Sequence, residues 1–296
     1  MSETVAVVRA SRPNFLILAP LCAGLGLAVA WQQNQPPALL DTLLVFIGAV
    51  LAHAAVNLLN EYEDFVSGLD NITQRTPFSG GSGALPEIPS AARRVLLAGL
   101  GTLALVIAIG VYFLWLRGLP MFVLGAAGVV LVVTYTRWIT RSPVLCLLAP
   151  GIGFGPVMVL GSLIALGARL DATALVCATV ALFLVSELLL INQIPDAEAD
   201  RQIGRKHLVI TLGPLRASRI VAALLLASFG LIAIASGTGL LPIWSLLALL
   251  PLPVAAWISW RLPRVLYEPQ ALNPVLGANV AVLLSTLALL VVGLSL

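Results

Sequence analysis

Apolar stretches long enough to cross a lipid bilayer dominate this chain and most constrain its fold. Separated by charges and Pro/Gly breaks, they cover 14–32, 39–61, 93–115, 120–137, 145–166, 172–194, 217–236, 242–260 and 272–295. A membrane-spanning helix needs about 20 apolar residues. Charged residues make up 10% of the sequence, against roughly 25% in soluble domains. The sequence therefore predicts an all-α, polytopic membrane bundle of about nine transmembrane helices, forming one domain over 1–296.

The basic residues indicate the orientation of these helices. With the amino terminus inside, 14 of the 16 Lys and Arg residues fall in inner loops, and only Arg117 and Arg169 fall outside. An excess of Lys and Arg marks the cytoplasmic side, so we expect an N-in, C-out protein surrounded by the lipids of a bacterial or archaeal-type cell membrane. The net charge of +3 is then a topological signal. Because no basic stripe with interleaved aromatic residues appears, nucleic acid is not an expected partner.

Two acidic clusters stand at the ends of the second and sixth apolar stretches, both on the predicted cytoplasmic side. The first comprises Asn60, Glu61, Glu63, Asp64 and Asp70, and the second comprises Asn192, Asp196, Glu198 and Asp200. Hard cations such as Mg²⁺ hold substrate phosphates through carboxylates and waters. Two such clusters facing each other across a membrane-embedded cavity would form a divalent-cation site, which indicates diphosphate chemistry on a membrane.

The spacing within the clusters strengthens this interpretation. Asn60 and Asp64 are four residues apart, as are Asp196 and Asp200, and residues at i and i+4 share one face of a helix. Carboxylates this close destabilise one another unless a cation or a proton neutralises them. A solvated helix end would explain one acidic cluster, but two clusters with the same spacing favour a shared cation site.

At these residues the chain resembles the UbiA superfamily of intramembrane prenyltransferases, especially the menaquinone-pathway branch, which is 1,4-dihydroxy-2-naphthoate prenyltransferase-like. The first family motif, N-D-x-x-D with a further Asp downstream, is matched by Asn60, Glu61, Asp64 and Asp70, with Glu61 departing from the usual Asp. The second motif, D-x-x-x-D followed by Gly and basic residues, is matched by Asp196, Asp200, Gly204, Arg205 and Lys206. The resemblance covers nearly the whole chain.

The resemblance implies a central cavity with a cytoplasmic cap formed by the two motif-bearing loops. It implies Mg²⁺-dependent transfer of a polyprenyl group from a prenyl diphosphate to an aromatic, quinone-precursor or lipid acceptor. The implied metal ligands are Glu61, Asp64, Asp70, Asp196 and Asp200. The expected diphosphate contacts are Asn60, Arg75, Asn192, Arg205 and Lys206, the last being the only lysine in the chain.

Two further residues are candidates for catalysis. Glu187 lies inside the sixth apolar stretch, and an ionisable group within a span suggests a cavity-facing role, here to orient or deprotonate an acceptor hydroxyl. A protonated Glu187 hydrogen-bonded between helices is the equally weighted alternative. Tyr135, at the end of the fourth stretch, is expected to line the cavity, where the π-face of its ring could stabilise a cation.

A connection rich in Gly, Ser and Pro, 70–87, follows the first cluster. Gly80, Gly81 and Gly83 can adopt backbone conformations closed to other residues. The segment could therefore fold over a bound diphosphate, or it could be a flexible connection. It lacks the G-x-x-x-x-G-K-[ST] pattern of a nucleotide-binding loop.

Two other classes of protein stay open on the sequence. A membrane transporter is one, because paired carboxylates at the edge of a span can carry cations, although here the acids lie at one face instead of the midplane. A non-catalytic assembly protein of the same fold is the other, for which the unusual Glu61 and the shifted Asp70 are the only hints.

Overall fold

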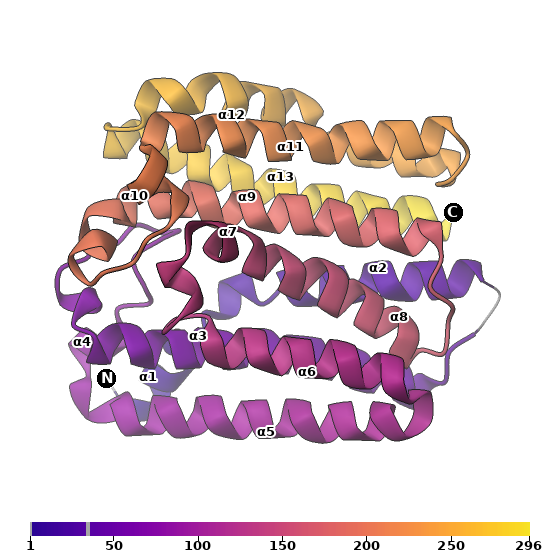
Figure 1. Ribbon diagram of the computed structural model, residues 1–296, viewed down its shortest axis with the longest axis horizontal. Coiled ribbons are helices and arrows are strands. Elements are labelled where there is room, and N and C mark those ends of the chain that lie inside the picture. The colour runs from indigo at the N-terminus through magenta and orange to yellow at the C-terminus, as the bar shows by residue number, and fades with distance from the viewer. Residues whose placement is uncertain (1, 34–35) are drawn as a thin grey trace.

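The computed structural model describes residues 2–33 and 36–296, in which every regular element is a helix (Figure 1). The first half contains α1 (Glu3–Ala10), η1 (Pro13–Phe15), α2 (Leu18–Gln32), α3 (Leu39–Val66), η2 (Leu69–Asn71), α4 (Ala84–Glu87), η3 (Pro89–Ala91), α5 (Ala92–Arg117), α6 (Leu119–Thr134) and η4 (Ile139–Arg141). The second half contains α7 (Pro143–Ile152), η5 (Gly153–Leu160), α8 (Gly161–Ala165), α9 (Ala172–Gln202), α10 (Leu208–Leu212), α11 (Pro214–Gly237), η6 (Ile243–Leu249), α12 (Leu252–Val265) and α13 (Pro269–Ser295). The predicted all-helical architecture is confirmed.

Seven helical segments of the described chain are long and apolar enough to cross a bilayer. They are Leu39–Val66, Pro89–Arg117, Pro143–Ala165, Ala172–Gln202, Pro214–Gly237, Ile243–Val265 and Pro269–Ser295. Glu3–Phe15 and Leu18–Gln32 form an eighth candidate, bent by 48°. Helix α6 is apolar but has 16 residues, fewer than the roughly 20 of a typical span. The protein is therefore an integral membrane protein, and a ninth crossing at α6 stays a prediction.

The long helices lie side by side, with the two termini at opposite ends of the bundle (Figure 1). Opposite ends are what an N-in, C-out topology requires. Helix α9 is the most buried of the spanning candidates, with 67% of its apolar window inside the protein, and it packs against α7, η5, α11 and α13. A helix that is apolar all round is expected in such a central position.

Small residues let α9 approach the α7–η5 segment closely. Gly151 and Gly155 are four residues apart on one face, and a Cβ at either position would collide with Ser186 or with the Ala178 carbonyl of α9. Close packing through small residues is typical of membrane helices. The segment changes from α-helix to the wider π-helix at Gly153, an irregularity that is frequent at functional sites.

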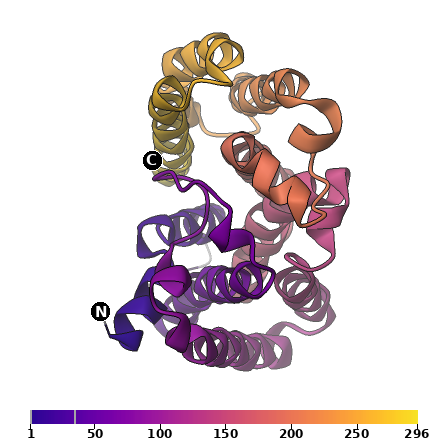
Figure 2. The same cartoon turned by 90° about the vertical axis from the view of Figure 1, so that its left-hand side faces the viewer.

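The loop between α3 and α4 crosses the end of the bundle, where Figure 2 shows it reaching toward α13. Phe78 of this loop packs on Gly277 of α13, since a Cβ at Gly277 would lie 3.0 Å from the Phe78 ring. The absence of a side chain at Gly277 therefore makes room on α13 for the aromatic ring of the loop. The contact connects the amino-terminal half of the bundle to its last helix.

Candidate active site

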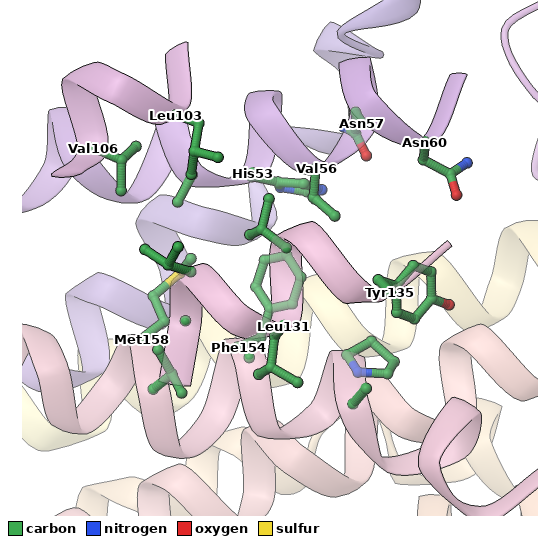
Figure 3. Close-up of a pocket in the computed structure, with 18 of the residues that line it drawn as sticks. His53, Val56, Asn57, Asn60, Leu103, Val106, Leu131, Tyr135, Phe154 and Met158 are labelled. Atoms are coloured by element: carbon green, nitrogen blue, oxygen red, sulfur yellow. The ribbon is translucent and has the colours of Figure 1, made fainter. Parts of the chain in front are cut away.

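A cavity of about 790 Å³ runs between α3, α5, α6 and the α7–η5 segment. One face of α3 lines it with Leu44, Gly48, Ala52, Val56, Asn60 and Asp64. At about 1.5 Å of rise per residue, this face is roughly 30 Å long. Apolar side chains fill most of the wall, as Figure 3 shows for Leu103, Val106 and Met158. Apart from His53 and Ser162, which lie further along the slot, most polar side chains gather at the end with Asp64, so the cavity is a long, mostly apolar slot with a polar head.

The first acidic motif reaches this polar head as an ordered pair. Asn60 Nδ2 donates to Asp64 Oδ2 at 2.9 Å, so the i, i+4 spacing does bring the two side chains to one face of α3. Thr136 Oγ1 donates to Asn60 Oδ1 at 2.9 Å. The segment after α6 therefore orients Asn60, and Asn60 in turn orients the buried carboxylate of Asp64.

The second motif meets the first through Arg205. Gly204, two residues after the end of α9, has φ of +84°, a left-handed conformation that is common just after a helix. It turns the chain back, and Arg205 Nη1 donates to Asp200 Oδ1 at 2.9 Å while Nη2 donates to Asp64 Oδ1. Asp200 Oδ2 also lies 3.1 Å from His207 Nε2. The two acidic clusters thus converge, as the sequence predicts.

The neighbouring carboxylates keep the Arg205 guanidinium protonated. Its side chain is 13% exposed. Burial by itself lowers the pKa of Arg205, but the carboxylates of Asp64 and Asp200 more than offset this, and its pKa is raised above the ordinary arginine value. The guanidinium therefore stays a cation at the polar head of the cavity, where it balances two carboxylates.

Two other motif carboxylates keep an oxygen without a hydrogen-bond partner among the described residues. Asp196 Oδ2 accepts from the Gly80 N–H at 3.1 Å, and Asp196 Oδ1 has no partner. Asp70 is buried and its Oδ2 has no partner. Burial, followed by the nearby Glu61 and Asp64 carboxylates, raises the pKa of Asp70 to about 7. Both Asp70 and Asp196 line the cavity.

The glycine-rich loop lies against the polar head, where Ser79, Gly80 and Gly81 line the cavity. Glu61 holds this loop, because its carboxylate accepts from the Ser82 N–H at 3.0 Å and from the Ser82 hydroxyl. Gly81 has φ of +78°, and a Cβ there would lie 2.9 Å from Asp70 Oδ1. Only glycine meets both the left-handed backbone and this close approach.

The donor set of the polar head fits Mg²⁺. No three His, Cys, Asp or Glu side chains within 2–33 and 36–296 converge closely enough to hold a metal by themselves. Mg²⁺ is, however, usually held by one or two carboxylates, with waters and substrate phosphates completing its shell. The unpartnered oxygens of Asp70 and Asp196 are donors of this kind.

Seven of the residues expected from the sequence line the cavity together with Arg205. They are Asn60, Asp64, Asp70, Tyr135, Asn192, Asp196 and Asp200. Tyr135 stands opposite Asn60 in Figure 3. Asn192 Oδ1 is buried without a partner among the described residues. The two motifs are separated by more than a hundred residues in the chain. The structure therefore brings most of their side chains together at the polar head of the cavity.

Four other expected residues lie outside the lining of the cavity. Glu61 bonds the glycine-rich loop, and Lys206 is exposed, with its backbone N–H bonded to the Thr140 carbonyl. The Arg75 guanidinium lies 4.0 Å from Glu87. Glu187 faces away from the cavity into the α9–α13 contact, where Asn279 Nδ2 donates to both carboxylate oxygens at 3.1 Å. Of the two equally weighted expectations for Glu187, the structure has the hydrogen bond between helices, and the cavity-facing expectation is corrected by this packing.

The sequence interpretation missed three residues at the site. His207 contacts Asp200 and Thr136 contacts Asn60, while Arg12 lines the cavity from the turn before η1. His207 directly follows the basic pair of the second motif, which was an available signal. Thr136 directly follows Tyr135, and Arg12 directly precedes Pro13 at the entry to the first apolar stretch, which were local signals, but both residues lie far along the chain from the two acidic motifs.

The sequence matches the UbiA prenyltransferase family over residues 17–273, and the chain belongs to this family of membrane prenyltransferases. Its curated relatives include the 1,4-dihydroxy-2-naphthoate octaprenyltransferase of Escherichia coli (strain K12), 30% identical over 99% of this chain and 96% of that protein. The Bacillus subtilis (strain 168) protein of the same name is 28% identical over 66% of this chain and 69% of that one. The expected resemblance to the menaquinone-pathway branch is confirmed.

Solved structures share the fold. A UbiA homolog from Aeropyrum pernix K1 superimposes with a TM-score of 0.70 at 19% identity, over 94% of this chain and 98% of that chain. A UbiA homolog from Archaeoglobus fulgidus, bound to GPP and Mg²⁺, gives a TM-score of 0.59 at 16% identity, over 96% and 99%. The whole helical bundle, and not one part of it, is therefore common to these proteins.

Proposed function

We propose that this prenyltransferase uses Mg²⁺ to transfer a polyprenyl group from a prenyl diphosphate to a hydroxylated aromatic acceptor of the 1,4-dihydroxy-2-naphthoate type. The active site would face the cytoplasm. One observation carries the proposal: Arg205 joins Asp64 and Asp200 at the polar head of a long apolar slot. A prenyl diphosphate has the matching shape and polarity, an anionic head on an apolar chain.

In this proposal the diphosphate binds at the polar head and the isoprenoid chain follows the apolar slot. Arg205, Asn60 and Asn192 would donate hydrogen bonds to diphosphate oxygens, with the planar fork of the arginine best suited to them. Asp64, Asp70, Asp196 and Asp200 would hold Mg²⁺ between protein and substrate. Bound Mg²⁺ would supply neutralisation of the charge that develops on the departing diphosphate.

The chemistry is an ionisation followed by an alkylation. The bond between the allylic carbon and the diphosphate oxygen breaks, the electron pair stays on the oxygen, and an allylic carbocation remains. An aromatic carbon of the acceptor then bonds this cation. That carbon loses its proton or, where it carries a carboxylate, carbon dioxide, and the electron pair of the broken bond returns to the ring. Tyr135, whose ring lines the cavity, would stabilise the cation by its π-face.

Other parts of the structure support an aromatic acceptor. Beside Tyr135, the cavity wall contains Phe154 and Pro150, together with the polar Asn192 and Gln193. Flat apolar surfaces with a few hydrogen-bonding groups are typical of sites for small aromatic molecules. The names of the curated relatives, which are naphthoate octaprenyltransferases, favour a bicyclic acceptor over a lipid one.

Prenyl transfer by the purified protein in detergent tests this proposal. Geranylgeranyl and octaprenyl diphosphates would be offered with 1,4-dihydroxy-2-naphthoate, with a monocyclic hydroxybenzoate and with a glycerol phosphate lipid, each with Mg²⁺ or with a chelator. We expect a prenylated naphthalene product that disappears on chelation. Product from the lipid acceptor alone, or equal turnover without divalent cation, would contradict the proposal.

A further inference from the structure

Arg12 occupies a conformation that is unusual for its residue type. In the turn between α1 and η1 it has φ of +51° and ψ of +62°, and it is the one non-glycine residue at positive φ within residues 2–33 and 36–296. This left-handed region is sterically disfavoured for a residue with a side chain. The turn is fixed by hydrogen bonds from the Arg12 N–H to the Arg9 carbonyl and from the Phe15 N–H to the Arg12 carbonyl, both at 2.9 Å.

The strained turn places Arg12 between two cavities. Beside the large cavity lies a second one of about 310 Å³, here called the vestibule, between the amino-terminal turn and the glycine-rich loop. It is lined by Val8, Arg9, Arg12, Pro13, Asn14, Phe15, Thr76, Pro77, Phe78, Ser79, Gly81 and Ser82. Arg12, Phe78, Ser79 and Gly81 line both cavities. A thin wall formed by one loop and one arginine therefore separates the two spaces.

The Arg12 guanidinium has donors to spare. Its side chain is 24% exposed, and its ion pair with Glu61 has an N···O distance of 3.8 Å, too long for a hydrogen bond. Among the described residues it donates no hydrogen bond, whereas Arg9 is bonded to Glu87 and Arg205 to two aspartates. A guanidinium carries five N–H donors in a fork that matches phosphate oxygens. Arg12 is thus equipped to bind an anion at the wall.

The two cavities differ in charge. The polar head of the large cavity is lined by Asp64, Asp70, Asp196 and Asp200. The described lining of the vestibule has two arginines and three hydroxyl residues, Thr76, Ser79 and Ser82, but no carboxylate. An anion that moves from the polar head to the vestibule therefore leaves four carboxylates, two of which are paired with Arg205, and enters a space whose described lining has no carboxylate. Arg9 there is bonded to Glu87, so Arg12 is the arginine of the vestibule with unused donors among the described residues.

We propose that Arg12 binds the diphosphate at the wall between the cavities, and that the vestibule is an inorganic diphosphate site through which the leaving group reaches the cytoplasmic face. This inference rests on the proposed function, because diphosphate is the product of that reaction. When the allylic carbon–oxygen bond breaks, the electron pair stays on the diphosphate, whose negative charge increases. The arginine therefore binds the leaving group more strongly than the esterified substrate, and the apolar chain remains in the slot.

A direct binding experiment tests the site without turnover. Inorganic diphosphate is titrated into the purified full-length protein in detergent with Mg²⁺, and the affinity is measured by calorimetry for wild type, Arg12→Gln and Arg201→Gln. Arg201 is the matched control, since it is 59% exposed, is paired with Glu198 and lines neither cavity. We expect at least a tenfold loss of affinity in Arg12→Gln and none in Arg201→Gln. Equal affinities for Arg12→Gln and wild type would overturn the inference.

Arg12→Lys provides a second variant for the same affinity measurement if Arg12→Gln does not fold. A lysine keeps the charge but loses the fork, so its affinity should fall between those of wild type and a neutral variant; wild-type affinity would overturn the bidentate role. Repeating the titration in nanodiscs containing phosphatidylglycerol separates free diphosphate from lipid headgroups. Loss of diphosphate binding there, with Arg12→Gln weakening only the lipid interaction, would assign Arg12 to the membrane and overturn the inference.

Kinetics distinguish failure of this inference from failure of the proposed function. In Arg12→Gln, inorganic diphosphate should become at least a tenfold weaker product inhibitor, while the KM for the aromatic acceptor stays unchanged. Prenyl transfer with unchanged product inhibition in Arg12→Gln would overturn the inference and leave the function standing. Binding of inorganic diphosphate that depends on Arg12, in a wild-type protein that transfers no prenyl group, would support the site and contradict the function.

Discussion

The guanidinium of Arg205 donates a hydrogen bond to the carboxylate of Asp64, 141 positions earlier in the chain. The same guanidinium bonds Asp200 at 2.9 Å, so one cation connects the acidic end of α3 to that of α9. All three side chains are largely buried. Because burial weakens the competition from water, such a connection is strong only while every partner is present.

Replacing Arg205 should therefore destabilise the protein as well as inactivate it. Arg205→Ala leaves two buried carboxylates uncompensated, and breaking a buried pair in this way costs about 3–5 kcal/mol. We expect a clearly lower melting temperature in detergent without Mg²⁺, together with loss of prenyl transfer. Arg201→Ala, which removes an exposed arginine from the same helix end, serves as the control. A melting temperature equal to wild type would show that Arg205 does not hold the motifs together.

Asp196→Asn should separate activity from folding. The asparagine keeps the shape of the side chain and an oxygen that can accept from the Gly80 N–H, but it loses the negative charge proposed to hold Mg²⁺. Since metal stabilisation of a transition state is worth several kcal/mol, kcat/KM should fall about 100-fold or more. The melting temperature should change little.

The control for Asp196 lies two residues away. Glu198 is 77% exposed and does not line the cavity, so Glu198→Gln removes one carboxylate of the same segment and should leave turnover intact. Comparable losses in Asp196→Asn and Glu198→Gln would mean that net charge at the helix end, and not a ligand at Asp196, controls the rate.

Gly81→Ala tests the close approach of the glycine-rich loop to the acidic motif. A Cβ at this position would lie 2.9 Å from Asp70 Oδ1 on a backbone with φ of +78°, so the loop or the carboxylate must shift. We expect a loss of prenyl transfer of about tenfold or more, the effect of displacing a group that positions substrate. Gly101→Ala in α5, where nothing lies within 4 Å, should retain activity, and equal activity of both variants would argue against a fixed loop.

Glu187→Gln should keep activity, in contrast to the substitutions above. Glu187 and Asn279 are completely buried and bonded to each other between α9 and α13, and glutamine preserves an acceptor for the Asn279 amide. Glu187→Ala should instead lower the free energy of unfolding by about 1–3 kcal/mol, the cost of a buried polar group left without its partner. Thermal unfolding and turnover of both variants check this. An inactive but stably folded Glu187→Gln would restore a catalytic role.

The raised pKa of Asp70 predicts that the free energy of unfolding depends on pH. Burial, then Glu61 and Asp64, raise the pKa of Asp70 to about 7 in the folded protein, against about 3.9 in an unfolded chain. Between these values the folded state binds more protons, so this group lowers the free energy of unfolding as pH rises from about 4 to 7. Asp70→Asn removes the effect. Without divalent cations, the variant should melt above wild type at pH 8, and the difference should shrink toward pH 4; a pH-independent difference would contradict the assigned pKa.

Much of this architecture follows from local sequence properties. Hydropathy is a property of consecutive residues, so the apolar stretches predict the helices, although not whether the 16 residues of α6 cross the membrane. The i, i+4 relation between Asn60 and Asp64 is likewise fixed by the helix itself and is found in the structure. The family motifs also identified the acidic ends of α3 and α9 from the sequence, because the residues of each motif lie close together in the chain.

A helical membrane protein with two acidic helix ends and prenyltransferase motifs could thus be predicted from the order of residues alone. Which side chains face the cavity became known from the packed bundle: Glu61 bonds Ser82, Glu187 bonds Asn279, and Arg12 lies between two cavities. The physical reason is that a helix specifies the direction of a side chain around its own axis, but not what lies opposite. That depends on how remote helices pack, and for Arg205 the partner lies 141 residues away.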